Sequence, residues 1–139
     1  MSRVTRSILQ MATTLRARLE PAFAKDTAAI GFPAATPSAG HCAAVATIFQ
    51  REHGGLLVSA NVNGMSHWFN RFPAGTDWLD VDITGDQFGR SKIQIAPSNT
   101  LYEGTRIRSP SEVNGETIFR AILLANRAGI GWIESPNST

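Results

Sequence analysis

The sequence is poor in several residues that many protein functions require. Its 139 residues include one cysteine, Cys42, and three histidines. A single cysteine excludes an internal disulfide framework, so we expect a cytoplasmic protein in a reducing compartment. No apolar run approaches the roughly 20 residues of a membrane-spanning helix, so we expect no membrane partner. The formal net charge is only +2, and such a small surplus argues against a nucleic-acid partner.

Motifs for bound cofactors and metals are also missing. The chain has no glycine-rich phosphate loop, no dinucleotide fingerprint and no Gly-x-Ser-x-Gly turn. It has no second thiol and no pair of histidines at helical spacing, so a zinc site built from Cys42, His67 and Asp82 is the weaker alternative. We therefore expect neither a cofactor nor a metal.

The pattern of apolar residues predicts an α+β fold. The length suits one domain over residues 1–134, with a flexible tail at 135–139. Apolar residues recur at helical spacing in some segments and alternate with polar ones in others. The first helix carries several arginines and no acid before Glu20, so a mitochondrial transit peptide is an alternative for this segment. We expect helices over 4–20, 42–53 and 115–128, strands over 56–62, 65–72 and 77–83, and edge strands over 92–96 and 101–108.

The single cysteine stands where a buried helix is expected to begin. Residues 42–53 are apolar on nearly all sides, and Gly54-Gly55 follows them as a C-cap signal. A thiol at a helix N-terminus faces unpaired backbone N–H groups and the positive end of the helix dipole, and both favour the reactive thiolate. The alternative is a cysteine that only fills space in the core. We expect Gly40 to adopt a positive φ or to pack closely against other backbone.

A histidine and two aspartates are expected to share one face of the sheet. Thiol chemistry commonly needs a histidine that takes the thiol proton and a polar group that orients the histidine. A turn centred on residues 74–75 would place His67 directly opposite Asp82, with Asp80 at a diagonal. The sequence thus favours a triad of Cys42, His67 and Asp82, with a simple cross-strand charge pair as the alternative.

Other residues near these three in the sequence are candidates for the walls of the site. The backbone N–H of Cys42 is a candidate donor to an oxyanion. Aromatic residues of the strands, Tyr102 among them, could line a pocket, although such residues more often belong to a core. The candidate site-lining residues are His41, Gly40, Gln87, Asp80 and Trp68.

Three segments carry a resemblance to a known family. The segments are Gly40-His41-Cys42-Ala43, Ser66-His67-Trp68-Phe69-Asn70-Arg71 and Asp82-Ile83-Thr84-Gly85-Asp86-Gln87-Phe88. With the helix that ends at Gly54-Gly55, they resemble the YunG-like bacterial proteins, which are largely uncharacterised. The family pattern has a glutamine directly before the cysteine, where this chain has His41, so no glutamine is carried over as an oxyanion donor at that position.

The order of these segments also resembles a wider class. A cysteine at the start of a buried helix, followed by strands that carry histidine and then aspartate, is similar to papain-like and transglutaminase-like cysteine folds. The resemblance implies a papain-like core, in which the N-terminal and central helices pack on an antiparallel β-sheet and a C-terminal helix follows. It also implies a site centred on the cysteine, without identifying a substrate.

The function we expect is that of a thiol enzyme acting on an amide or ester, as a hydrolase, deamidase or acyltransferase. Cys42 would attack a carbonyl carbon, His67 would move the proton, and Asp82 would orient His67. The substrate would be a protein or peptide, or a small amide or acyl compound. The alternative is a non-catalytic binding module that keeps the fold. A deep cleft reaching Cys42 favours the enzyme, and a thiol sealed under side chains favours the module.

Overall fold

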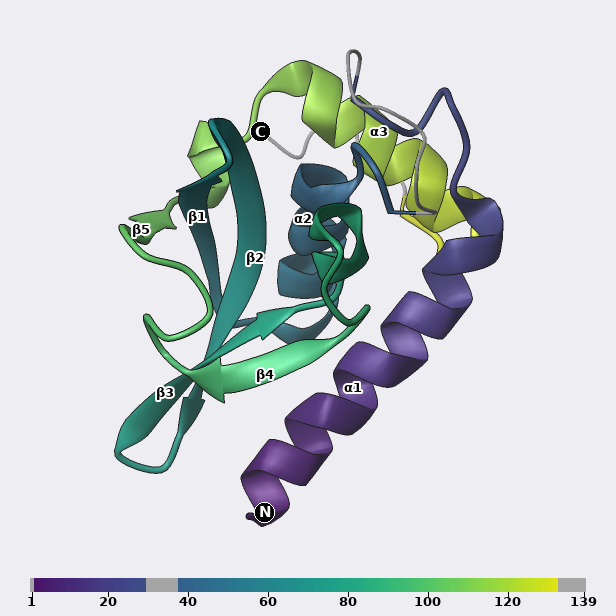
Figure 1. Cartoon of the computed structure of the whole chain (residues 1–139). Helices are drawn as coiled ribbons and strands as arrows, with labels where there is room; N and C mark the ends of the chain where they lie inside the picture. Colours follow the sequence, from purple (N-terminus) through teal and green to yellow (C-terminus); the bar gives the residue numbers. More distant parts are fainter. Residues whose placement is uncertain (1, 30–37, 133–139) are drawn as a thin grey trace.

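The computed structural model describes residues 2–29 and 38–132 of the chain (Figure 1). Helices and strands both contribute, so the predicted α+β class is confirmed. The predicted tail over 135–139 lies outside the described residues. In chain order the elements are α1 (Arg3–Leu19), η1 (Glu20–Ala22), α2 (Cys42–His53), β1 (Leu56–Val62), β2 (Met65–Ala74), β3 (Asp77–Asp82), η2 (Gly85–Phe88), β4 (Gln94–Pro97), β5 (Arg106–Arg108), η3 (Pro110–Glu112) and α3 (Gly115–Arg127).

The strands form one antiparallel sheet of five strands in the order β4-β3-β2-β1-β5. Its centre is the predicted meander β1-β2-β3. The β1–β2 turn is Asn63-Gly64, and both residues have positive φ, as a tight type I′ hairpin requires. The two predicted edge strands are present but short, with β5 reduced to three residues beside β1.

The predicted register between β2 and β3 is wrong by two residues. Arg71 pairs with Asp80, and the turn is Gly75-Thr76 rather than one centred on residues 74–75. Gly75 has φ +67°, which suits the first central residue of a two-residue hairpin turn. Because side chains alternate between faces with a period of two, a shift of two residues leaves every side chain on its predicted face.

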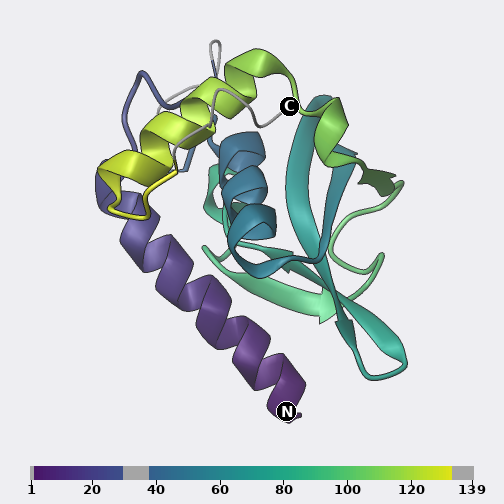
Figure 2. The same ribbon diagram turned by 180° about the vertical axis from the view of Figure 1, so that it is seen from behind.

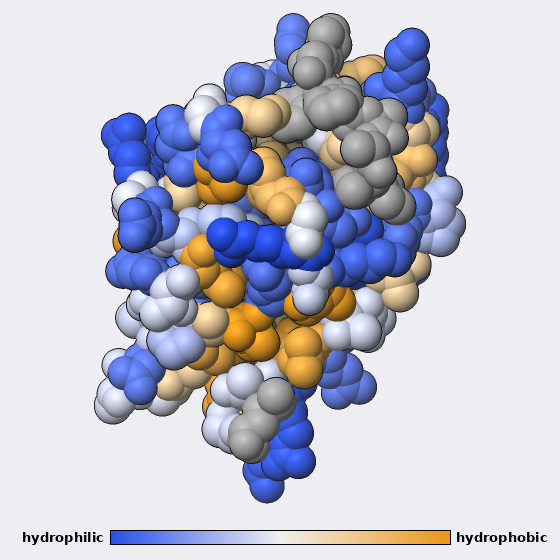
Figure 3. Space-filling view, viewed as in Figure 1, coloured by the Kyte–Doolittle hydropathy of each residue, from blue (hydrophilic) through white to orange (hydrophobic). Residues whose placement is uncertain are grey.

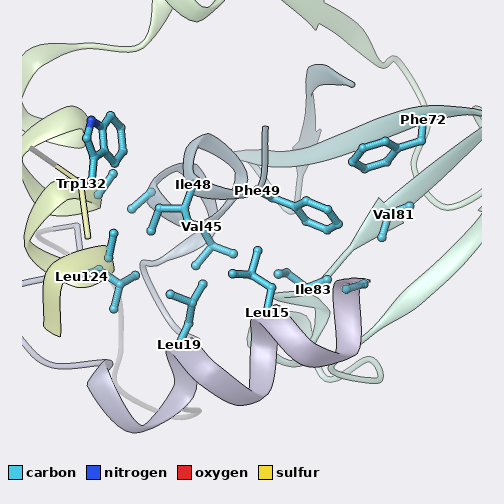
Figure 4. Close-up of a cluster of buried hydrophobic side chains, with 14 of the residues drawn as sticks. Leu15, Leu19, Val45, Ile48, Phe49, Phe72, Val81, Ile83, Leu124 and Trp132 are labelled. Atoms are coloured by element: carbon cyan, nitrogen blue, oxygen red, sulfur yellow. The ribbon is translucent and has the colours of Figure 1, made fainter. Parts of the chain in front are cut away.

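Helix α2 lies between the sheet and the other two helices (Figures 1 and 2). This position explains why it is apolar on nearly all sides, since both of its faces are covered. Helix α1 turns a stripe of apolar residues spaced by three and four, Ile8 to Leu19, toward this core. Labelled members of the core in Figure 4 are Leu15, Leu19, Val45, Ile48, Phe49, Phe72, Val81, Ile83, Leu124 and Trp132.

The helix ends follow the predicted signals. Asn114 caps α3 through a hydrogen bond from the Thr117 backbone N–H to its side chain. At the other end, Gly129 has φ +77° and Ile130 N–H donates to Ala125 C=O, the bond pattern of a Schellman motif. No helix among the described residues is long and apolar enough to cross a bilayer. The face shown in Figure 3 is mostly hydrophilic, with a hydrophobic area in its lower half.

Candidate active site

The thiol of Cys42 lies at the first residue of α2 and against strand β2. Gly40, with φ +79°, turns the chain so that α2 begins at Cys42. Ala29 N–H donates to Gly40 C=O at 2.9 Å and ties this turn to the preceding segment. The sulfur is 4.0 Å from Ser66 C=O. The first turn of a helix leaves backbone N–H groups without intrahelical partners, so this end of α2 favours a negative charge on sulfur.

The imidazole of His67 and the carboxylate of Asp82 are hydrogen-bonded, with Nε2 and Oδ2 2.8 Å apart. Both side chains are buried, at 0% and 1% exposure. The contact is diagonal between β2 and β3, since the register that pairs Asn70 with Val81, continued by one residue, places Asp82 across from Phe69. The pairing that the sequence predicted is therefore present, although its geometry differs.

Asp82 is the most heavily hydrogen-bonded group of the site. Besides His67, it accepts bonds from the Tyr102 hydroxyl and from Thr84, whose N–H lies 3.0 Å and whose hydroxyl lies 3.3 Å from Oδ1. Burial alone would raise the pKa of Asp82, but these donors and the charge of His67 hold the pKa below its usual range. The carboxylate is thus kept ionised in a buried position.

His67 is surrounded by aromatic rings. Phe69, Phe88 and Tyr102 lie 4.8–5.9 Å from it, centroid to centroid. This burial disfavours the charged imidazolium, yet the hydrogen bond to Asp82 and the interaction with Cys42 raise the pKa of His67 from 6.5 to about 9. At neutral pH the ring therefore holds a proton that it can deliver.

The pKa of the Cys42 thiol is shifted in the opposite direction from that of His67. Burial favours the neutral thiol, but the hydrogen bond and charge of His67, the backbone N–H of Trp68 and the amide of Gln87 lower the pKa of Cys42. A lowered thiol pKa next to a raised imidazole pKa favours transfer of the thiol proton to the imidazole, which would give a thiolate–imidazolium pair.

Gln87 bridges the helix start and the histidine. Its Oε1 accepts a bond from Gly40 N–H at 3.3 Å, and its Nε2 lies 2.9 Å from His67 Nδ1. Because Gly40 N–H needs an acceptor, the amide is oriented with its NH₂ group toward His67 and Cys42. That group can donate to Nδ1 of the neutral ring or to the thiolate sulfur.

Other predicted site-lining residues have different surroundings. His41 is buried away from the thiol: Nε2 lies 2.7 Å from the Thr27 hydroxyl, Nδ1 lies 3.0 Å from Ala39 C=O, and the ring stacks on Phe23. Burial lowers the pKa of His41, so it stays neutral near pH 7.

Two more of the candidates also face other partners. Asp80 forms a buried ion pair with Arg71, with Nε and Oδ1 2.5 Å apart. Trp68 contributes its backbone N–H to the thiol, while its ring lies under the guanidinium of Arg108. The residues that sequence reasoning missed are Thr84 as a partner of Asp82 and Tyr102 as a hydrogen-bond donor rather than a pocket wall.

The thiol is covered in this structure. Cys42 is 5% exposed. Three hollows on the described part of the chain lie elsewhere, with walls from α1, the end of α2, the segment after α1 and α3. None of these three is lined by Cys42, His67 or Asp82. The described residues also gather no group of His, Cys, Asp and Glu suited to a metal ion.

Fold and site together describe an α+β protein with a buried Cys–His–Asp constellation. The chain matches the family model described as YunG protein over residues 11–116. This span is well over half of the chain and includes every residue of the constellation, so the protein belongs to the YunG family. Neither the curated proteins nor the solved structures contain a match to it.

Proposed function

We propose that the protein is a thiol enzyme acting on an amide or ester bond, with Cys42 as nucleophile, His67 as acid and base, and Asp82 as the residue that orients His67. The observation that carries the proposal is the hydrogen-bonded His67–Asp82 pair beside a thiol at a helix N-terminus. The order of helix, histidine strand and aspartate strand also supports a place among the papain-like and transglutaminase-like folds.

The chemistry follows from the two nitrogens of His67. Because Nε2 is bonded to Asp82, Nδ1 is the nitrogen that takes the proton of the thiol. The sulfur then attacks the carbonyl carbon, and the C–O π electrons move to oxygen. When the tetrahedral intermediate collapses, the bond to the leaving amine or alcohol breaks and the imidazolium protonates that group. Water or another acceptor, deprotonated by His67, then attacks the thioester and releases Cys42.

Two donors are available for the developing oxyanion. The backbone N–H of Cys42 belongs to the first turn of α2, and the NH₂ group of Gln87 is directed toward the thiol by its bond to Gly40. Hydrolysis, deamidation and acyl transfer share this machinery. We propose a protein, a peptide or a small acyl compound as substrate, and a reducing cytoplasm as the compartment in which a free thiol persists.

One observation favours a second function, a non-catalytic binding module of the same fold. Cys42 is 5% exposed, so a carbonyl carbon cannot reach the sulfur unless the covering side chains move. In such a module the ion pair would be a structural element. A buried charge pair contributes little net stability, however, so its retention is easier to explain by chemistry than by folding.

Native-state labelling with acyl electrophiles of increasing size separates the two functions. We expect parent protein to be labelled at Cys42 without denaturant, and the label to be abolished in Cys42→Ala and strongly reduced in His67→Ala. His53→Ala is the matched control, because His53 lies at the far end of the same helix. Labelling that needs denaturant, or that is equal in parent and His67→Ala, would overturn the enzyme proposal.

A further inference from the structure

A buried ion pair outside the triad joins α1 to the turn that carries Gln87. Arg16 of α1 is 2% exposed, and its guanidinium holds the carboxylate of Asp86 in two bonds, Nη1–Oδ1 at 2.8 Å and Nη2–Oδ2 at 2.9 Å. Nη1 also donates to Ile83 C=O at 2.7 Å. Two parallel bonds from a rigid guanidinium fix both the place and the orientation of the carboxylate.

The same carboxylate is also tied to the segment before Cys42. Ser38 Oγ donates to Asp86 Oδ1 at 2.5 Å. Burial opposes the charge of Asp86, but the bonds from Arg16 and Ser38 hold its pKa below the usual range. Asp86 therefore connects three separate stretches of chain: α1, η2 and the approach to the catalytic helix.

Gln87 is the next residue along η2, and its amide is the part of this turn that enters the site. Its position there depends on where η2 sits, because its only described partners are Gly40 N–H and the Cys42–His67 pair. A displacement of η2 by an ångström would break bonds of 2.9–3.3 Å.

We propose that Arg16 and Asp86 are positioning residues of the thiol site, which hold η2 so that the Gln87 NH₂ group, 2.9 Å from Nδ1 of His67, is placed to donate to the sulfur of Cys42 once Nδ1 carries a proton. This inference rests on the proposed function, and it assigns a role to an ion pair that contacts neither the thiol nor a substrate. Acting through Gln87, the pair stabilises the thiolate and keeps a donor available for the oxyanion.

The variant Asp86→Asn tests positioning because a pure charge effect has the opposite sign. Removal of the carboxylate leaves Arg16 with only its longer ion pair to Glu20, at 3.5 Å, and the added net positive charge near the site would favour the thiolate and speed alkylation. Loss of positioning withdraws a hydrogen bond from the thiolate and slows alkylation. The groups that face the sulfur are His67, Gln87, the Trp68 backbone and the Ser66 carbonyl, with Asp82 and Tyr102 behind His67.

The measurement is the rate of iodoacetamide alkylation of the folded protein from pH 5 to pH 10. We expect Asp86→Asn to lower the rate at pH 6 by about three- to tenfold, which is less than the roughly ten- to hundredfold expected for complete loss of one hydrogen bond to a charged group. In a Gln87→Leu background the same substitution should have no slowing effect. Asp26→Asn is the control for loss of a two-bond arginine pair, because Asp26 forms such a pair with Arg127, at 2.6 Å, on an exposed surface out of contact with the site.

Faster alkylation in Asp86→Asn, or equal slowing with and without Gln87, would overturn the inference. If Asp86→Asn fails to fold, Ser38→Ala removes one bond to the carboxylate and leaves the Arg16 pair in place. It should slow alkylation by a smaller factor, and an unchanged rate would contradict the inference. An ordinary thiol profile in the parent protein would instead refute the proposed function, so the two failures are distinguishable.

Discussion

Replacement of Asp82 by asparagine removes the charge that stabilises the His67 imidazolium and keeps the shape of the side chain. The asparagine amide could still accept a bond from His67, but it carries no charge to favour a proton on the ring. We expect the pKa of His67 to fall from about 9 toward its ordinary value. The proton on His67 lowers the pKa of Cys42, so the thiolate becomes less populated at neutral and acidic pH.

The size of the effect follows from the hydrogen bond between His67 and Asp82. A hydrogen bond to a charged group contributes about 1.5–3 kcal/mol, which corresponds to about 1–2 pKa units. Each unit makes the thiolate–imidazolium pair tenfold less populated relative to the neutral pair. We therefore expect alkylation of Asp82→Asn at pH 6 to be about ten- to hundredfold slower than in parent protein. The two alkylation rates should become equal near pH 9, where a thiol ionises without stabilisation by His67.

The assay is the second-order rate of iodoacetamide alkylation from pH 5 to pH 10, read by intact mass. Asp80→Asn is the matched control, since Asp80 is also a buried carboxylate of β3 in a charge pair. It should lower the melting temperature, as loss of a buried pair costs about 3–5 kcal/mol, and leave the rate profile unchanged. A folded Asp82→Asn protein that reacts at pH 6 within twofold of the parent rate would refute the reasoning.

Two further predictions concern stability. In Cys42→Ala, Asp82 still raises the pKa of His67, but the contribution of Cys42 is lost. The free energy of unfolding should therefore fall by about 1–2 kcal/mol as pH rises above 6.5, because a raised His67 pKa stabilises the fold fully only below 6.5. In parent protein the proton lost by His67 on unfolding returns to the thiol, so a denaturant series should give a nearly flat profile between about pH 6.5 and 8.5, and a steep parent profile would contradict the ion pair. Gly40→Ala should cost about 1–3 kcal/mol and slow labelling, because φ is +79° and a Cβ would lie 3.1 Å from Ala28 Cβ. Gly64→Ala has the same φ in open space and should cost less without slowing labelling; equal costs in thermal melts would exclude crowding at Gly40.

Local patterns in the sequence were sufficient for the main helices and strands and for the shared face of His67 and Asp82. The helix beginning at Cys42, the Asn63-Gly64 hairpin and the capped α3 each depend on residues within a few positions of one another. The shared face of His67 and Asp82 also follows from local information, because alternation along a strand fixes faces as long as the register error is even. This is why the contact between His67 and Asp82 was predicted in spite of the wrong register.

Only the tertiary structure decided the register and the surroundings of Cys42, His67 and Asp82. The choice between a turn centred on residues 74–75 and the Gly75-Thr76 turn depends on pairing along all of β2 and β3. Tyr102 reaches Asp82 from a loop 20 residues further along the chain, and Arg16 reaches Asp86 across 70 residues. No periodicity links such residues, because their contacts depend on how the packed layers bring distant segments together. The sequence by itself determined which side chains could act on the thiol, and packing determined which of them reach it.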